Sequence, residues 1–273
     1  MTEVQKVIKY MAIALAIILI VSIVSGVISF FLGMGLIFNI GSKDVIGETT
    51  GMTFEQEEVS RLDIKIAASN LTIRKGDKLH ATTNNKNIEI NQRNNKIEIK
   101  EKGVNRWYSK NNGSELTIYI PEDVLLNEVE IDAGAGRINI EDIKTEKFDL
   151  QLGAGETVIN NIEVKRECEI NGGAGKIEIK SSLLNNLDLD LGIGETIIQA
   201  KLIGNSDIDA GVGNLNLNLQ GEKEEYKIRA EKGVGTIKID NEDVKNNTVY
   251  GEGQNFVKID GGVGNIKINF ENI

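Results

Sequence analysis

The stretch Ile131–Ile140, which reads IDAGAGRINI, sets the pattern for most of the chain. A degraded copy at 64–73 has Ala67 and Ser69 in place of its two glycines. The first glycines of the good copies are spaced 19 to 29 residues apart. Periods of about 20 residues are typical of stacked repeats, none of which can bury its own apolar face alone. Six further segments repeat the pattern in full: 150–159, 170–179, 189–198, 208–217, 230–239 and 259–268.

Apolar residues alternate on both sides of the Gly-x-Gly, which is the period of a β-strand that stops and restarts at the glycines. Glycine permits positive φ and close backbone approach at such a bend. The residue between the two glycines is small or medium-sized and apolar in every copy, so we expect it to point inward: Ala135, Ala154, Ala174, Ile193, Val212, Val234 and Val263. Where Gly-x-Gly is missing, residues 92–95 are expected to link two strands instead.

These features predict an all-β fold, a β-solenoid with coils of about 19–22 residues and Gly-x-Gly bends, in which equivalent strands stack in parallel about 4.8 Å apart. The column after the second glycine offers a check on the register. Its first four members alternate in sign, so that neighbours would attract across adjacent strands. They are Arg137, Glu156, Lys176 and Glu195.

The N-terminal part contains an uncharged apolar run, residues 11–38. It exceeds the roughly 20 residues that span a bilayer, which predicts one N-terminal transmembrane helix ahead of the solenoid. A cleaved signal peptide would have an apolar region of about 7–15 residues and an A-x-A-like site, which the run lacks. A buried core helix is the other alternative, and the length of the run argues against it. We therefore predict an uncleaved signal-anchor.

Basic residues predict the orientation of this anchor, because Lys6 and Lys9 precede it and only Lys43 follows closely. The predicted organisation is a cytoplasmic N-terminus (1–10), the transmembrane signal-anchor (11–38), a polar linker (39–57) and an extracytoplasmic β-solenoid domain (58–273). The protein is thus expected in the cell membrane, single-pass, with its C-terminal domain extracellular. The single cysteine, Cys168, allows no intramolecular disulfide, which suits a bacterial surface protein.

Charge and composition restrict the function. The formal net charge is −10, which argues against nucleic acid and against docking on anionic lipid, and favours a cation or a basic partner. The only histidine, His80, is expected on the surface, and Cys168 is expected to be a small buried hydrophobe. No nucleophile elbow, phosphate loop or His/Cys metal motif is present. We predict no catalytic residues and a protein that is not an enzyme. An enzyme acting on a cell-wall polysaccharide is the least favoured alternative, because the acids recur evenly instead of clustering.

A polar column lies two residues before each first glycine, and its members are Asp132, Gln151, Asn171, Asp190, Asp209, Glu231 and Asp260. Carboxylate and amide oxygens suit calcium, but Asp and Asn side chains also accept backbone hydrogen bonds at turns. Calcium-binding β-rolls repeat G-G-x-G-x-D, and the closest match here has Ile177 in place of the aspartate. We therefore predict no metal and no cofactor. Asp132, Asp190, Asp209 and Asp260 remain the candidate ligands should calcium bind.

A loop at 101–113 interrupts the repeats and contains Trp107 and Tyr108 beside Arg106 and Lys110. Exposed aromatic residues next to cations suit contact with sugars or with a protein partner. Trp107 and Tyr108 are therefore our candidate contact residues. The alternative is that both fold back over the open edge of the early coils.

An apolar anchor followed by Gly-x-Gly-x-[ILT]-x-[IL] coils, each with a preceding Asp or Asn, resembles the bacterial "putative adhesin" family. This resemblance covers Leu62–Phe270. It implies a β-solenoid domain of unknown function, found in membrane-anchored proteins of Gram-positive bacteria, some encoded beside regulators of cell-envelope stress. The family carries no catalytic residues to transfer.

The resemblance and the acidic repeats together lead to a function hypothesis. We expect a non-enzymatic, adhesin-like cell-surface protein that binds an envelope component or a membrane or surface protein. The alternative is an accessory factor in cell-envelope stress signalling that acts through a membrane partner. In that case Ser22 and Gly26, four residues apart in the apolar run, would allow close helix packing.

Overall fold

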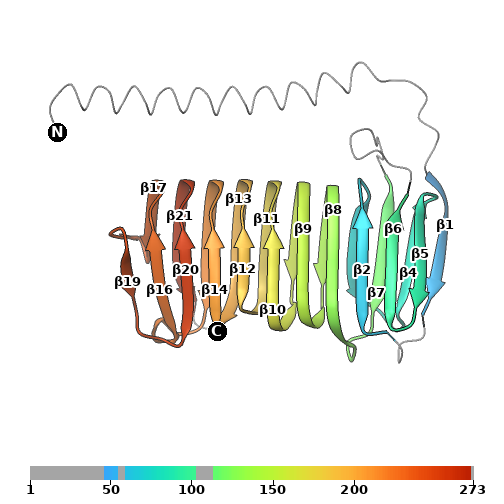
Figure 1. Ribbon diagram of the computed structural model, residues 1–273, viewed down its shortest axis with the longest axis horizontal. Coiled ribbons are helices and arrows are strands. Elements are labelled where there is room, and N and C mark those ends of the chain that lie inside the picture. Colours follow the sequence, from blue (N-terminus) through green and yellow to red (C-terminus); the bar gives the residue numbers. More distant parts are fainter. Residues whose placement is uncertain (1–45, 55–58, 103–112, 272–273) are drawn as a thin grey trace, which may run out of the picture. The chain divides into compact units, whose positions relative to one another are not determined.

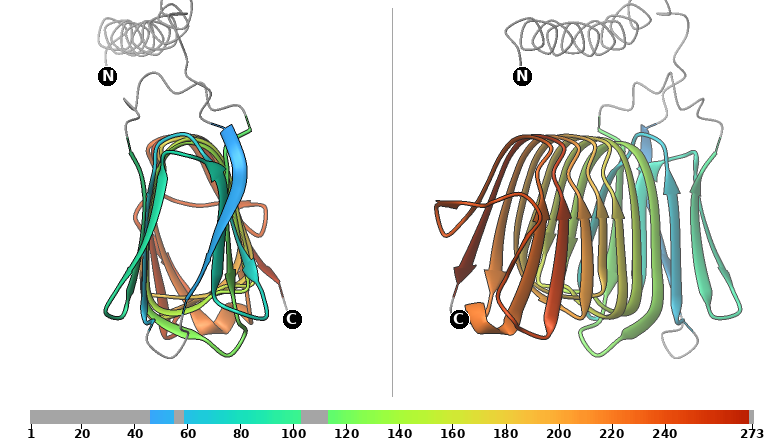
Figure 2. Two further views of the ribbon diagram at one scale, coloured as in Figure 1. Left: turned by 90° about the vertical axis from the view of Figure 1, so that its right-hand side faces the viewer. Right: turned by 60° about the vertical axis from the view of Figure 1, so that its left-hand side comes forward.

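The computed structural model describes residues 46–54, 59–102 and 113–271. Residues from Val45 onward form one compact unit. Its strands wind into a stack of coils with two long faces (Figures 1 and 2). The predicted membrane anchor at 11–38 lies outside the described residues. Within the ranges that are described, no helix has the length and apolar character of a membrane span.

Strand β8, Leu125–Glu141, shows how one coil is built. Residues 128–133 form the first face, Gly134–Gly136 make the bend, and residues 137–141 form the second face. Asp142, with φ of 57°, then turns the chain toward a short closing side, which starts with Lys144 of β9 (Lys144–Asn160). We call the row of Gly-x-Gly bends the glycine edge; it lies opposite the closing side.

Equivalent strands pair in parallel along both faces, as the repeat predicts. On the first face the order is β6 (Lys96–Glu101), β2 (Arg61–Ile66), β8, β9, β10 (Glu163–Asn171), β12 (Leu187–Asp190), β14 (Asn205–Asp209), β20 (Asn255–Asp260) and β16 (Tyr226–Glu231). On the second face the order is β7 (Glu115–Ile120), β3 (Asn70–Lys75), β8, β9, β11 (Ala174–Asn185), β13 (Ile193–Ile203), β15 (Val212–Gln220), β21 (Val263–Glu271) and β17 (Val234–Ile239).

The coils are out of sequence order at both ends of the stack. The coil made by β20 and β21 lies between the coil of β14 and β15 and the coil of β16 and β17, so the chain skips one place and later returns to fill it. At the other end, β2 and β3 lie between β8 and the later strands β6 and β7. The 29-residue spacing from Gly233 to Gly262 contains this return.

Antiparallel strands cover the ends of the stack and so protect its unpaired edges. At one end β4 (His80–Asn85) pairs with β7, and β1 (Ile46–Thr53) pairs with β4. At the far end β18 (Glu242–Asp243) and β19 (Thr248–Tyr250) cover β17 and β16, after the single-turn 3₁₀ helix η2 (Lys223–Glu225). Strand β1 thus occupies part of the segment for which the sequence predicts a linker.

Residues 92–95 link two strands, as expected, but they do not replace a Gly-x-Gly bend. They end β5 (Ile88–Arg93) and form the tight turn of its antiparallel hairpin with β6, not a bend between two faces of a coil. Asn94 adopts a φ of 52°, which such a turn requires. The strands on either side alternate in the same way in both arrangements, so their pattern does not distinguish a hairpin from a coil.

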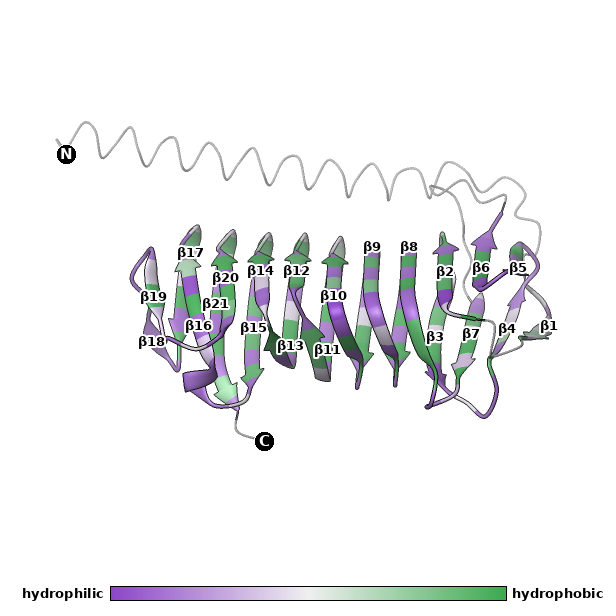
Figure 3. Cartoon of the chain, turned by 60° about the horizontal axis from the view of Figure 1, so that its bottom comes forward, coloured by the Kyte–Doolittle hydropathy of each residue, from purple (hydrophilic) through white to green (hydrophobic). Residues whose placement is uncertain are grey.

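The core is a continuous column of inward side chains, and hydropathy alternates along the strands accordingly (Figure 3). Cys168 lies fully buried between Phe148 and Leu187 in the ladder, as expected, and burial raises the pKa of its thiol. His80 lies half-buried next to Thr53, whose hydroxyl is 3.1 Å from His80 Nδ1.

The glycines of the bends are required by backbone contact between neighbouring coils. A Cβ on Gly155 would lie 1.9 Å from the carbonyl oxygen of Gly136, and Gly155 itself has φ of +146°. The N-terminal bend, Ala67–Ser69, is the exception because no further Gly-x-Gly stacks outside it. There, Glu101 Oε2 accepts hydrogen bonds from the amides of Ala67 and Ala68, at 2.7 and 3.1 Å.

The residue between the two glycines points outward, so the expectation that it points inward is wrong. Ile193 is 48% exposed, Val212 40%, Val234 66% and Val263 42%. The physical reason is that the two strands of a coil give conflicting parities at the bend. Counted forward from Ala133 the middle residue Ala135 would face inward, whereas counted backward from Ile138 it faces outward, and the ladder follows the second count.

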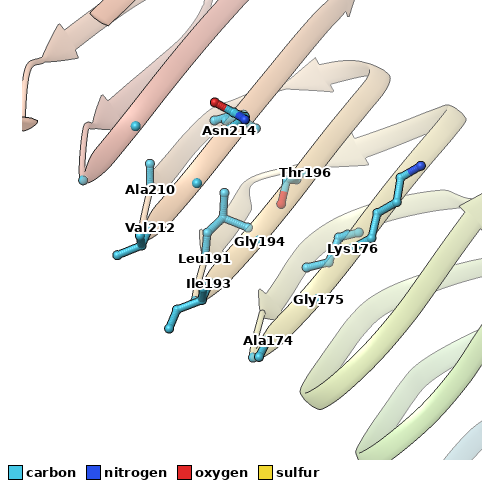
Figure 4. Close-up of a pocket in the computed structure, with 18 of the residues that line it drawn as sticks. Ala174, Gly175, Lys176, Leu191, Ile193, Gly194, Thr196, Ala210, Val212 and Asn214 are labelled. Atoms are coloured by element: carbon cyan, nitrogen blue, oxygen red, sulfur yellow. The ribbon is translucent and has the colours of Figure 1, made fainter. Parts of the chain in front are cut away.

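Residue sizes are matched beneath the glycine edge in six of the seven Gly-x-Gly coils. In two of them the residue before the first glycine is large and the second residue after the last glycine is small, as in Leu152 with Thr157 and Leu191 with Thr196. Four coils reverse the sizes, with the pairs Ala133 and Ile138, Gly172 and Ile177, Ala210 and Leu215, and Gly261 and Ile266, whereas the coil of β16 and β17 has Lys232 and Ile237, both large. Only a narrow cavity of ≈ 50 Å³ remains there. In Figure 4, Leu191 and Ala210 point away from the side on which Ile193 and Val212 project.

Candidate functional site

The polar column seen in the sequence is a single in-register ladder on the outer side of the first face. Each member lies directly opposite its neighbour in the next coil. In stack order the ladder is Lys65, Asp132, Gln151, Asn171, Asp190, Asp209, Asp260 and Glu231. Asp209 and Asp260 are neighbours only because the later coil is inserted between two earlier ones.

A second column of acids runs beside the first, and the sequence analysis did not identify it. Its members precede those of the first column by two residues, so they project from the same side of each strand. In stack order they are Asp63, Glu130, Asp149, Glu169, Asp188 and Asp207, followed by Lys258 and Arg229. We call the nine acids of the two columns that lie between Lys65 and Lys258 the acidic face: Glu130, Asp132, Asp149, Glu169, Asp188, Asp190, Asp207, Asp209 and Asp260.

Carboxylates on the acidic face are close enough to disfavour one another's ionisation. Burial raises the pKa of Asp149, and the charges of Glu169 and Glu130 raise it further. Burial and then the neighbouring acids likewise raise the pKa values of Asp188 and Asp209. Burial and mutual repulsion therefore both disfavour the ionised form of these three carboxyls.

Cations of the chain reach the acidic face at its two ends. Lys258 Nζ lies 2.6 Å from Asp260 Oδ2 and 3.2 Å from both carboxylate oxygens of Asp207. These hydrogen bonds to Asp260 and Asp207 raise the pKa of Lys258. At the other end Lys65 Nζ donates to Glu130 Oε1 at 2.9 Å. Between the coils of these two lysines the surface is acidic.

The candidate calcium ligands fall into two places. Asp209 and Asp260, together with Asp207, can bring one carboxylate oxygen each to within 4.8 Å of one another. The ammonium of Lys258 contacts two of these three carboxylates and supplies the positive charge there. Asp190 is the next rung beside Asp209, but Asp132 lies three rungs further along the ladder, between Lys65 and Gln151. Ile177 points into the core, so the aspartate of a calcium-binding β-roll has no counterpart in that coil.

The candidate contact residues Trp107 and Tyr108 lie outside the described residues. The ends of their loop are described. Glu101 binds the amides of the first bend, and Gly113 accepts a 2.8 Å hydrogen bond from the Asn84 side chain. The loop therefore leaves and re-enters the domain at the glycine edge.

A second hollow, of ≈ 510 Å³, lies along the closing side. Charges of both signs line it, including Lys75 and Glu122, which form an ion pair, and Lys144. Asn161 donates a 2.5 Å hydrogen bond to Asp142 in the same wall. The lining thus combines polar groups of the turn residues with the apolar residues Ile162 and Leu183.

Solved structures similar to this chain include two bacterial proteins. No curated protein matches the chain. Among solved structures, the chain is similar to a putative adhesin from Bacteroides fragilis NCTC 9343, with 14% identity, a TM-score of 0.50, and coverage of 81% of this chain and 97% of that one. It is also similar to a putative cell adhesion protein from Clostridium sporogenes ATCC 15579, with 19% identity, a TM-score of 0.41, and coverage of 82% and 99%.

Family membership rests on the sequence of the repeats themselves. At the identities found, the structural likeness to the Bacteroides fragilis protein shows the fold alone. The model of the family described as Toastrack DUF4097 matches residues 59–267, which spans nearly the whole stack of coils. This chain therefore belongs to the Toastrack DUF4097 family.

Proposed function

We propose that this protein is a non-enzymatic, membrane-anchored cell-surface protein whose solenoid binds a component of the cell envelope or a partner protein. Three observations support the proposal. A solved protein of the same fold, from Bacteroides fragilis, is described as a putative adhesin. The uncharged run at 11–38 has the length of a single membrane span. The described domain displays a long acidic face on a rigid stack.

The acidic face carries the proposal. Each coil of the face contributes one or two carboxylates, at a spacing between coils of about 4.8 Å that the backbone ladder fixes. Rigid repeated faces suit extended partners, because folding has already ordered the surface and binding loses little further conformational entropy. The raised pKa values of Asp149, Asp188 and Asp209 indicate that added positive charge would be favourable there. The expected partner is therefore an extended envelope polymer or a protein segment with basic groups.

Support for a non-enzymatic role comes from the placement of the reactive side chains. The Cys168 thiol is fully buried and its pKa is raised, so it is held as the unreactive thiol. His80 lies on β4, beside Thr53 and the Tyr119 ring, and is remote in the stack from the acidic face. The acids recur along the stack as a ladder of like groups, and do not converge on one bond as the carboxyl pair of a glycosidase does.

Co-sedimentation of the full chain with purified cell-wall sacculi, in detergent, tests the proposal. We expect saturable pelleting that weakens with salt. The variant Asp188→Asn, Asp190→Asn, Asp207→Asn should bind about tenfold more weakly, which corresponds to three charge-assisted contacts of a few tenths of a kcal/mol each.

A matched control removes three exposed acids from the far end of the stack, Glu242→Gln, Asp243→Asn and Glu252→Gln, and should bind as the parent does. Equal weakening in both variants would show that net charge, not the acidic face, governs binding. A folded parent that stays in the supernatant would refute wall binding. Loss of pelleting with a chelator would assign a metal role to Asp209 and Asp260.

A further inference from the structure

The glycine edge carries a row of exposed aliphatic side chains on four consecutive coils. In stack order they are Ile193, Val212, Val263 and Val234, and each pairs with the next in the ladder. All four are among the large apolar residues that the described surface leaves exposed. Scattered apolar residues are normal on a protein surface, but a contiguous row marks a surface that meets another apolar phase.

The row projects from a convex edge. Each of its members stands between two glycines, which have no side chains to shield it, and Figure 4 shows Ile193 and Val212 projecting away from the coils. The column on the second-face side is uncharged beside the last three members. Asn265 donates to Asn214 at 3.2 Å and Thr236 donates to Asn265 at 2.8 Å. A projecting apolar row beside neutral polar groups has the character of an interfacial membrane contact.

The entry point of the chain lies at the same edge. Strand β1 begins at Ile46, opposite Asn85. The Asn85 side chain donates to Ser69 Oγ at 3.1 Å, and Ser69 closes the first bend of the glycine edge. Only residues 39–45 separate Ile46 from the apolar run that ends at Phe38. Seven residues reach at most about 25 Å, which limits how far Ile46 can lie from a membrane that the run would enter.

We infer that the glycine edge lies against the lipid surface in which the chain is anchored, with Ile193, Val212, Val263 and Val234 in the interfacial layer. The inference rests on the membrane anchoring proposed above. The row consists of four partly exposed aliphatic side chains, and even a single acyl chain gives only marginal membrane binding. The contact therefore depends on the tether and orients the domain without anchoring it.

Charge specifies the kind of lipid. Asp190, Asp209 and Asp260 stand on the first face, three residues before the exposed row. Anionic headgroups would meet these carboxylates, whereas zwitterionic headgroups would not be repelled. The favoured surface is thus zwitterionic, and added anionic lipid should weaken the contact, most strongly at low salt.

The test places an environment-sensitive fluorophore on the edge of the full chain reconstituted in phosphatidylcholine vesicles. Val212→Cys provides the labelling site, because the native Cys168 is fully buried with a raised pKa and does not compete. Leu125→Cys is the matched control, since Leu125 is also exposed (41%) but starts β8 on the closing side. Nitroxide-bearing lipids report contact through quenching.

We expect the Val212 label to be blue-shifted and quenched at least about twofold more than the Leu125 label, as befits a residue inside the interface. Adding phosphatidylglycerol at low salt should reduce this difference. The double variant Ile193→Asn, Val263→Asn should reduce it too, while vesicle flotation of the chain stays unchanged.

Two failures are distinguishable. A chain that does not float with the vesicles refutes the anchor and this inference with it. A chain that floats while both labels are quenched equally refutes this inference alone, and the exposed row would then belong to a protein partner.

Discussion

The Cδ1 atom of Ile177 fills the space that a side chain at Gly172 would need: a Cβ built on Gly172 would lie 3.0 Å from it. One coil earlier, Leu152 and Thr157 line the same narrow cavity with the sizes reversed. These two coils therefore compensate within themselves for the volume beneath their bends. Neighbouring coils can stack at a constant distance although their sequences differ.

This compensation predicts coupling between Gly172 and Ile177. Gly172→Leu should overpack the coil and cost about 1–3 kcal/mol of unfolding free energy, and Ile177→Thr should cost a similar amount through the void it leaves. The double variant, which copies the Leu152 and Thr157 arrangement, should be more stable than the two costs predict, by about 1 kcal/mol or more. Urea unfolding of the four proteins measures the coupling. Additive effects would show that the two sites do not share one volume.

The geometry of the bend predicts that a substitution at Gly155 destabilises the protein, whereas one at the adjacent Ala154 does not. Gly155→Ala places a Cβ 1.9 Å from the Gly136 carbonyl oxygen, at a φ of +146°. We expect it to cost at least about 3 kcal/mol, because backbone would have to move. Ala154→Asn should change stability by less than about 0.5 kcal/mol, because this side chain points into solvent. Thermal unfolding compares the two. A large loss in Ala154→Asn would show that the middle residue faces the core.

The inserted coil predicts a non-local effect of truncation. Removing residues from 255 onward deletes the coil of β20 and β21, which is the parallel neighbour of both β16 and β17. We expect β16 and β17 to lose amide protection completely, although their own residues are intact, while β9 keeps its protection. Hydrogen exchange read by mass spectrometry reports both. Persistent protection of β16 would mean that it can stack directly on β14.

The acidic face predicts that ionised Asp188 lowers the stability of the fold, so that removing its charge stabilises the protein at neutral pH. Burial and neighbouring acids raise the folded-state pKa of Asp188 above its ordinary value of 3.8, so its ionised form destabilises the fold. Asp188→Asn should therefore raise the melting temperature at pH 7. The gain should shrink as the pH falls through the raised folded-state pKa and vanish below 3.8.

Glu122 supplies the control of opposite sign. Its hydrogen bond and ion pair with Lys75 lower the pKa of Glu122 below the ordinary 4.5. Glu122→Gln should lower the melting temperature at neutral pH, and this loss should fade as the pH falls below 4.5 through the folded-state value. If both variants shifted in the same direction, net charge and not local environment would be the cause.

The repeat predicted the parts of the fold that depend on local period. Alternation placed Cys168 in the core beside Phe148, and alternating charges predicted a register in which Arg137 Nε lies 3.2 Å from Glu156 Oε2. The repeat did not predict the order in which the coils stack. The coils of Val263 and Val234 have the same motif, so either could stack on the coil of Val212, and the connections between coils, not the repeat, determine which one does.

The candidate site was predictable where it depends on the repeat and not where it depends on the order of the coils. The ladder through Asp190 and Asp209 follows from the repeat, because equal positions in successive coils must meet. Its contact with Asp260 depends on the inserted coil, and Lys258 comes with that coil. The second column, including Asp188, stands in the sequence as acids two residues earlier in most of the strands, with Lys258 and Arg229 in the last two.

Synthesis proceeds from the N-terminus, and for this domain that direction has a consequence. β16 and β17 emerge before β20 and β21, yet they need them as their parallel neighbours. Until those later residues have been made, the earlier coil has only its own antiparallel hairpin strands to pair with. The far end of the stack therefore completes its folding in one late step, when β20 and β21 insert between two coils that have already been made. A ribosome that stalls before residue 255 would leave two coils unfinished instead of one.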